Sequence, residues 1–437
     1  MKTKITLFDC YTKKTGLAYM TGMQALVRLL LEQKQLDSER GLKTCGLVSG
    51  YPGSPLGGFD IELNRHQDLL VKNQITFQPA INEELAATAI WGSQHIHLYD
   101  NPNIDGVFGL WYGKGPGLDR SLDALRHVNM GGVSPYGGMV LAVGDDPTGK
   151  SSTIAYQSEQ TLIAAGIPFF FPRSIHDIIP LGLKAFALSR FSGCCVGLKI
   201  VVDTADASAV VNLDKISPKI LSPEPIKSVH IRKHDPALER ENLLFNVRLP
   251  AAESFQKKNQ INVFTKPSQK FCKVGIVGVG KSILEINDTL RSLGIKNPSH
   301  RGIGLFSVIM PFPIEKTTII EFIKDFDEIF VIEEKRPIVE EQISRTIVNI
   351  PDRPIITGKL APDGTKLLPA TGEITHSELL LALSKRLSAH SIPTNPVSQS
   401  VFRKLTSLPT ISNRTPWYCA GCPHNSSTKL PDGEIAG

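Results

Sequence analysis

The stretch TCGLVSGYPGSP, residues 44–55, joins a short apolar run to a segment rich in Gly and Pro. A run of this length that ends in such residues is typical of a buried strand followed by a turn. The pattern recurs in IDGVFGLWYGKGPG (104–117) and GGMVLAVGDDP (137–147), and helical patterns flank these segments, as in GMQALVRLLLEQKQL (22–36) and EELAATAIWGSQHIHL (83–98). Strands that alternate with helices predict a parallel α/β sheet.

The loops after these three strands are candidates for one shared binding site. They are GYPGSP (50–55), YGKGPG (112–117) and GDDPTGK (144–150), all rich in Gly, Pro or Asp. Ligands of parallel sheets bind at the carboxyl ends of the strands, so loops at neighbouring strand ends meet.

The chain of 437 residues is too long for one core and divides by composition. The first α/β unit is predicted to span residues 1–215. Residues 216–270 are polar and irregular, which indicates a linker with some helix. A second, smaller α/β unit is predicted over 271–395, and residues 396–437 belong to neither unit.

Composition excludes several classes of protein. The net charge is only +6 and the Lys and Arg residues are spread out, which gives no support for nucleic-acid binding. No apolar run reaches the ~18 residues that a membrane span needs, and the N-terminus has no secretory pattern. The seven cysteines do not have the even spacing of a disulfide framework. A cytoplasmic protein without membrane contact is expected.

Two stretches fit the phosphate-loop pattern G-x-x-x-x-G-K-[ST], namely GDDPTGKSS (144–152) and GIVGVGKS (275–282). In the first, Pro147 removes one N–H group, and Asp145 and Asp146 place carboxylates where an anion would bind. In the second, the first Gly lies inside the apparent strand. Ordinary βα loops are therefore favoured, and a P-loop ATPase remains an alternative.

Seven motifs, taken in order, carry a family resemblance. They are GYPGSPLGGFD, NEELAATAIWGSQ, WYGKGPGLDRSLDALRH, GDDPTGKSSTIAYQSEQ, IVGVGKSILE, VIEEKRPIVEEQI and YCAGCPHNSSTKLPDG. The set resembles the 2-oxoacid:ferredoxin oxidoreductases, which use thiamine diphosphate, and in particular the indolepyruvate branch in its long fused form. The resemblance implies a parallel-sheet pyrimidine-binding domain over 1–215, a transketolase C-terminal-like α/β domain over 271–395, and the start of a diphosphate-binding, iron–sulfur domain within 396–437.

The resemblance implies a catalytic role for Glu83. In the family, a Glu binds a pyrimidine nitrogen of the cofactor and stands nine residues before a helix glycine, as Glu83 stands before Gly92. Glu84 is the rival for this role. From the residues alone, an acidic residue after the cap Asn82 is also explained by the helix dipole.

The resemblance also implies roles for residues of the three strand-end loops. YPGSP is similar to the family's YPxTP element, in which the hydroxyl residue, here Ser54, holds the substrate carboxylate, with Tyr51 beside the cofactor. Gly115 and Gly117 correspond to a Gly-Pro-Gly segment that the cofactor approaches closely. Asp145 is a cofactor-binding candidate, although the 144–152 loop either lines the site or shapes its wall. From the residues alone, plain turns explain these loops equally well.

Cys419 and Cys422 form a Cys-x-x-Cys pair, which the resemblance assigns to an incomplete ligand set of a [4Fe–4S] cluster. Half of a zinc site is the alternative. The family's Mg²⁺ and diphosphate site contains a GDG element, and this sequence has none. The chain therefore resembles an N-terminal portion of an enzyme that oxidises an arylpyruvate such as indolepyruvate with coenzyme A and ferredoxin. We expect it to be inactive alone and to act as a homo-oligomer or with a complementing subunit.

Overall fold

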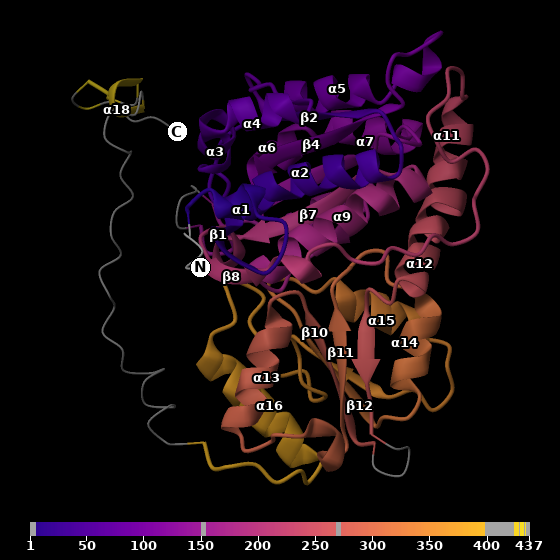
Figure 1. Ribbon diagram of the computed structural model, residues 1–437. Coiled ribbons are helices and arrows are strands. Elements are labelled where there is room, and N and C mark those ends of the chain that lie inside the picture. Colours follow the sequence, from indigo (N-terminus) through magenta and orange to yellow (C-terminus); the bar gives the residue numbers. More distant parts are fainter. Residues whose placement is uncertain are drawn as a thin grey trace.

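The computed structural model describes residues 6–149, 154–267, 272–397, 424–427, 429–431 and 433. Two α/β domains lie one above the other in Figure 1, and each is built around its own sheet. Within the described residues, no helix combines the length and the apolar character that a bilayer span requires.

The first domain holds a six-stranded parallel sheet in the order β3-β2-β4-β5-β7-β6. The predicted parallel sheet is therefore confirmed. A separate pair, β1 and β8, runs antiparallel. The strands are β1 (Leu17–Thr21), β2 (Thr44–Gly50), β3 (Ile75–Phe77), β4 (Gly106–Lys114), β5 (Met139–Asp145), β6 (Phe169–Phe170), β7 (Val196–Val201) and β8 (Ser208–Asn212). The helices are α1 (Asp9–Thr12), α2 (Gly22–Glu39), α3 (Phe59–Arg65), α4 (Gln67–Lys72), α5 (Glu83–Ser93), α6 (Gly115–Arg120), α7 (Leu122–Gly131), α8 (Glu159–Ala164), α9 (Ile175–Ser192) and α10 (Val202–Ala205).

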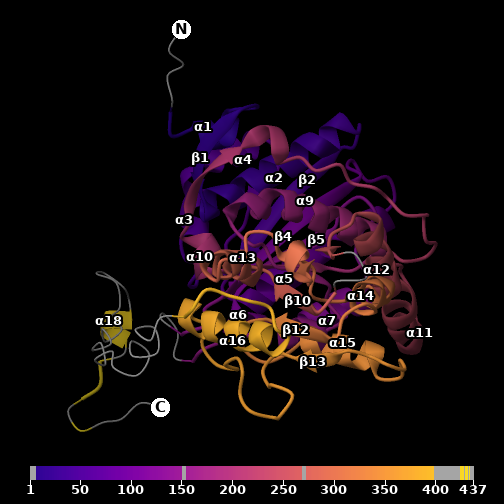
Figure 2. The same ribbon diagram turned by 90° about the horizontal axis from the view of Figure 1, so that it is seen from below.

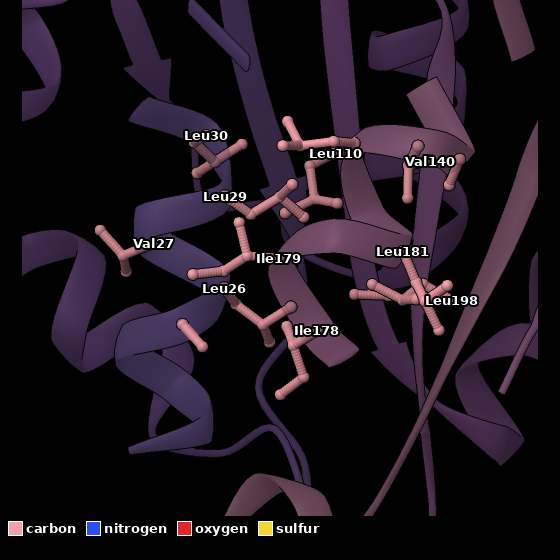
Figure 3. Packing of buried hydrophobic residues seen from close by; sticks show 14 of the residues in the cluster. Leu26, Val27, Leu29, Leu30, Leu110, Val140, Ile178, Ile179, Leu181 and Leu198 are labelled. Carbon is pink, nitrogen blue, oxygen red and sulfur yellow. The ribbon is translucent and has the colours of Figure 1, made fainter. Parts of the chain in front are cut away.

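Helices α2 and α9 cover one face of this sheet. Helix α2 begins at a capping box in which Thr21 and Gln24 satisfy each other's backbone N–H groups. Its apolar residues pack on those of α9, and a Cβ on Gly182 of α9 would lie 2.3 Å from Leu29 Cδ2, so the two helices approach closely. Figure 3 shows this buried contact, in which the labelled residues are Leu26, Val27, Leu29 and Leu30 of α2, Ile178, Ile179 and Leu181 of α9, and Leu110, Val140 and Leu198 of the strands.

The second domain has a five-stranded sheet in the order β13-β12-β10-β11-β9, in which only β9 is antiparallel to its neighbour among the described strands. Helices α13 and α16 lie on one face and α14 and α15 on the other (Figure 1 and Figure 2). The elements are β9 (Val263–Thr265), β10 (Val274–Val279), α13 (Ser282–Ser292), β11 (Ile303–Val308), α14 (Lys316–Ile323), β12 (Glu328–Ile332), α15 (Val339–Ile347), β13 (Ile355–Thr357) and α16 (His376–Ala389).

The segment predicted as a linker contains ordered structure that contacts both domains. It holds α11 (Ala237–Leu243) and α12 (Leu249–Lys258), and α12 packs against α9. Between these helices, the guanidinium of Arg248 is buried and donates to four carbonyl oxygens, one from Val229 and three at the end of α7. Strand β9 then joins the second sheet, so the segment is bound to both domains.

The two domains also meet directly at β6, the edge strand of the first sheet. The N–H of Phe169 donates to Phe312 O (3.1 Å), and that of Phe171 donates to Ile309 O (2.8 Å). A single apolar cluster includes Val143 of the first domain and Phe306 of the second. The interface therefore combines backbone hydrogen bonds with buried apolar contact.

Candidate active site

The three predicted loops meet at the carboxyl edge of the first sheet, because β2, β4 and β5 are neighbouring strands. Two close approaches demonstrate this. A Cβ on Gly53 would lie 2.9 Å from Lys114 Cδ, and one on Gly144 would lie 2.9 Å from Pro55 Cδ. The prediction that these segments lie together is therefore confirmed, although residues 112–117 form the end of β4 and the start of α6 and not a loop.

Glu83 lies at the start of α5 and faces Gly113 at the end of β4 and Gly117 at the start of α6. Asn82 caps the helix by accepting the N–H of Leu85 (2.9 Å), and Trp111 Nε1 donates to Glu83 O (2.9 Å). The side chain is buried, with only 8% of Glu83 exposed. Its neighbour Glu84 is exposed. Of the two acidic residues, therefore, only Glu83 is buried at this edge of the sheet.

Glycine is required opposite Glu83 because the side chain occupies the space of a Cβ. A Cβ on Gly117 would lie 2.2 Å from Glu83 Oε1, and one on Gly113 would lie 3.1 Å from Glu83 Cγ. A Cβ on Gly115 would overlap the ring of Tyr156, at 1.8 Å from Cδ1. Within the described part of the chain, no hydrogen bond or ion pair reaches the Glu83 carboxylate. It is a buried acid that lacks a protein partner there.

Asp145, the last residue of β5, is buried and bound by donors of the chain itself. It accepts from Ser158 Oγ (2.5 Å) and Ser158 N (3.0 Å), and its Oδ2 lies 3.1 Å from Lys199 Nζ. Lys199 also pairs with Glu159 and lies 4.6 Å from the ring centroid of Phe171. Burial acts to lower the pKa of Lys199, but attraction to the two carboxylates outweighs it, so the pKa is raised. This triad anchors both ends of the 146–158 loop.

The sequence analysis missed Lys199 and Glu159. A signal was present, because Lys199 interrupts the apolar run GLKIVV (197–202), and a lysine in a buried strand needs an anionic partner. The partner could not be identified from the sequence, since Glu159 stands 40 residues away.

Tyr51 and Ser54 lie in the loop after β2. Tyr51 is 41% exposed, and its N–H donates to Tyr112 O (3.1 Å). Ser54 is partly buried, and its hydroxyl has no hydrogen bond to any of the residues described. The structure thus leaves both side chains available at the edge where Glu83 lies.

Three buried polar atoms near the strand ends lack hydrogen-bond partners among the described residues. They are Ser49 Oγ on β2, Tyr112 Oη on β4 and Asp60 Oδ1 on α3. Burial, together with the charge of Asp60, raises the pKa of Tyr112, and burial also raises the pKa of Asp60. An unsatisfied buried polar atom calls for an explanation, and a bound water, ion or polar ligand is one.

The two phosphate-loop patterns lie in different surroundings. After the first, residues 154–158 are not helical and α8 begins only at Glu159. Lys150 and Ser151 lie outside the described residues. In the second stretch, the first Gly is inside β10, and Lys281 is surrounded by carboxylates, with Nζ 2.7 Å from Asp203 Oδ2 and within 3.8 Å of three Glu residues. An ammonium group held in this way is not free to bind phosphate.

Cys419 and Cys422 lie outside the described residues, and their assignment stays a prediction. Elsewhere, Cys194 and Cys195 are buried, and burial raises the pKa of both thiols, that of Cys194 to about 11. Within the described ranges no group of three or more His, Cys, Asp or Glu side chains is arranged to hold a metal ion.

Solved structures share this two-domain architecture. The 2-oxoglutarate:ferredoxin oxidoreductase from Magnetococcus marinus matches with a TM-score of 0.58 at 14% identity, over 85% of this chain and 66% of that one. A split-gene transketolase, solved as an inactive β4 tetramer, matches with a TM-score of 0.52 at 12% identity, over 85% of this chain and 99% of that one. The chain thus has the fold of the 2-oxoacid oxidoreductase and transketolase class, as predicted.

Sequence comparisons identify the branch within that class. A family model described as the indolepyruvate oxidoreductase domain matches residues 265–408. The chain is 24% identical to indolepyruvate oxidoreductase subunit IorA of Pyrococcus horikoshii, over 97% of this chain and 60% of that protein. It is 23% identical to the IorA of Methanothermobacter thermautotrophicus, over 93% of this chain and 59% of that protein. The chain is therefore related to the indolepyruvate ferredoxin oxidoreductases, which confirms the resemblance, and it spans about three fifths of the length of these relatives.

Proposed function

We propose that the first domain binds the aminopyrimidine of thiamine diphosphate in an enzyme that oxidises a 2-oxoacid. The observation that carries this proposal is the buried Glu83 carboxylate, which has no partner among the described residues and faces Gly113 and Gly117. The residues fit the group, because an aminopyrimidine offers ring nitrogens to a carboxylate, and Glu83 faces Gly113 and Gly117, which carry no side chain. When bound, the cofactor supplies the carbon that attacks the 2-oxo group.

The roles of the chain's own residues follow from their positions. Glu83 would exchange a proton between its carboxylate and a pyrimidine nitrogen. Trp111 and Asn82 hold the start of α5 through their bonds to Glu83 O and Leu85 N, and thereby orient the acid. Ser54 would donate to the substrate carboxylate, with Tyr51 beside it. Asp145 is proposed to position the 146–158 loop, since its oxygen atoms already accept from Ser158 and face Lys199.

We further propose indolepyruvate as substrate, coenzyme A as acyl acceptor and ferredoxin as electron acceptor, in the cytoplasm. The names of the relatives and the bound 2-oxoglutarate and coenzyme A of the Magnetococcus marinus enzyme support this. Cys419 and Cys422 are proposed as two ligands of a [4Fe–4S] cluster. No described residue is assigned to Mg²⁺ or to the diphosphate. The chain is proposed to act in an assembly, as a homo-oligomer or with a complementing subunit.

Replacement of Glu83 by Gln is expected to lower turnover by about a hundredfold, because an amide keeps the shape of the acid but cannot exchange the proton. The chain would be purified from its own cells with the proteins that accompany it. Turnover would be measured as viologen reduction that depends on indolepyruvate and coenzyme A. The exposed Glu84 gives the matched control Glu84→Gln, which should retain native turnover. Undiminished turnover in Glu83→Gln would reject the assignment.

Replacement of Gly117 by Ala is expected to weaken thiamine diphosphate binding by about tenfold, because the new Cβ would take the place of Glu83 Oε1. The cost in stability should be about 1–3 kcal/mol, since the new Cβ would also overlap Cδ and Cγ of the buried Glu83 side chain. Calorimetric titration of the same assembly measures the affinity. Gly92→Ala is the control, because a Cβ on Gly92 meets nothing within 4 Å. Equal affinity in both variants would contradict the proposed geometry.

A further inference from the structure

A cavity of about 370 Å³ lies at the C-terminal end of α5, opposite the end that carries Glu83. With eleven residues, the helix separates the two places by roughly 15 Å. Its walls come from the end of α5, the 3₁₀ turn η1 (Ile96–Leu98), the end of α7 and residues 231–240. The cavity is thus separate from the carboxyl edge of the sheet.

The lining of this cavity combines aromatic rings with cations. Trp91 and Tyr99 provide the rings, Arg232, Lys233 and Arg240 provide the charge, and none of the lining residues is acidic. Arg232 pairs with Asp235 at 2.9 Å. Lys233 and Arg240 have no ion pair or hydrogen bond to any described residue. Two cations without a counter-ion therefore stand beside two aromatic side chains.

The helix ends do not account for these two cations. Carbonyl oxygens at the end of a helix attract positive side chains. At α5, however, His95 Nδ1 already lies 3.0 Å from Trp91 O, and at α7 the guanidinium of Arg248 binds the terminal carbonyls. Lys233 and Arg240 are thus left for an external anion.

We propose that this cavity binds a nucleoside phosphate. Its base would lie against Trp91 and Tyr99, because every base presents a flat face to an aromatic ring. Its phosphate would accept charge-assisted hydrogen bonds from Lys233 and Arg240. The backbone before Arg232 and Lys233 is fixed by two contacts. Arg248 donates to Val229 O at 2.6 Å, and His97 Nε2 lies 3.2 Å from Ile231 O.

The test is calorimetric titration of the full chain with ADP, with adenosine and with inorganic phosphate. ADP should bind at least about tenfold more tightly than either of the other two, because only ADP engages both the rings and the cations. Its affinity should also fall as salt is added. Binding of adenosine as tight as that of ADP, or no ADP binding at about 1 mM, overturns the proposal.

The double variant Lys233→Ala/Arg240→Ala should lose at least about tenfold in ADP affinity. Folding should survive, because neither side chain has a partner among the described residues, and circular dichroism would verify this. Lys258→Ala/Arg291→Ala removes the same charges from exposed positions outside the cavity and should bind ADP normally. Unchanged affinity in the first double variant rejects the site.

Three further measurements separate related explanations. Tyr99→Ala, at a position that is 69% exposed, should weaken ADP binding and leave phosphate binding unchanged. Glu83→Gln should leave ADP binding unchanged, so this proposal stands or falls independently of the proposed catalytic role. A parallel titration with coenzyme A, which contains an ADP unit, distinguishes a free nucleotide from a larger cofactor.

Discussion

Replacement of Lys199 by Met should lower the free energy of unfolding by about 3–5 kcal/mol, which is typical when one partner of a buried ion pair is removed. The ammonium group neutralises Asp145 and Glu159, and all three side chains are buried. Methionine fills the space of the lysine stem but leaves two carboxylates without their counter-ion. Urea unfolding of the two proteins side by side measures the difference.

Two comparisons make the Lys199 result specific. Lys72→Met, at an exposed position at the end of α4, should change the free energy by less than about 0.5 kcal/mol. The pair Lys199→Met/Glu159→Gln should recover part of the loss, because one uncompensated charge is removed. If Lys199→Met and the native protein unfolded at the same urea concentration, the triad would not stabilise the folded chain.

The sign of the pH dependence follows from the raised pKa of Lys199. A lysine whose pKa is higher in the folded state contributes stability at every pH below its unfolded pKa and loses that contribution as the pH rises through the folded value. The difference between native and Lys199→Met should therefore persist from neutral pH to about 10 and shrink above that.

Replacement of Arg248 by Met should cost roughly 3–5 kcal/mol, because four buried carbonyl oxygens lose a charged donor at once. Three of these oxygens belong to residues 129–131 at the end of α7, where a cation is also favoured by the helix dipole. Urea unfolding gives the size of the loss, and hydrogen exchange should show faster opening at the end of α7.

The matched control for Arg248 is Arg291→Met, which removes an exposed guanidinium paired with Asp288 and should change stability by less than about 0.5 kcal/mol. Arg248→Lys should recover only part of the loss, since an ammonium group cannot reach four carbonyls in the geometry of a guanidinium. Native stability in Arg248→Met would mean that the segment after residue 216 is held by its apolar contacts alone.

Local sequence pattern predicted the alternating strands and helices and the meeting of the three strand-end loops. Apolar periodicity and turn residues are local, and the carboxyl ends of parallel strands share an edge by topology. That Glu83 is buried against Gly117 while Glu84 is exposed could not be predicted, because it depends on how α5 packs on its neighbours.

Long-range polar contacts could not be predicted. Lys199 pairs with Glu159, which is 40 residues away in the sequence, and Arg248 donates to the carbonyl oxygen of Met130, which is 118 residues away. Neither pairing leaves a periodic signal, since it depends on how separate elements pack. The cavity beside Trp91 was missed for the same reason, because Lys233 and Arg240 lie far along the chain from α5, in a segment predicted as a linker with some helix.

The backbone bonds of Phe169 and Phe171 to the second domain limit where the chain can be divided. Cutting it between the domains would leave the N–H groups of Phe169 and Phe171 without acceptors along an apolar edge. Unpaired edges of this kind recruit other chains and favour aggregation. Fragments for expression, fusion or domain exchange should therefore keep residues 309–312 with the first domain, and the two sheets should be treated as one folding unit.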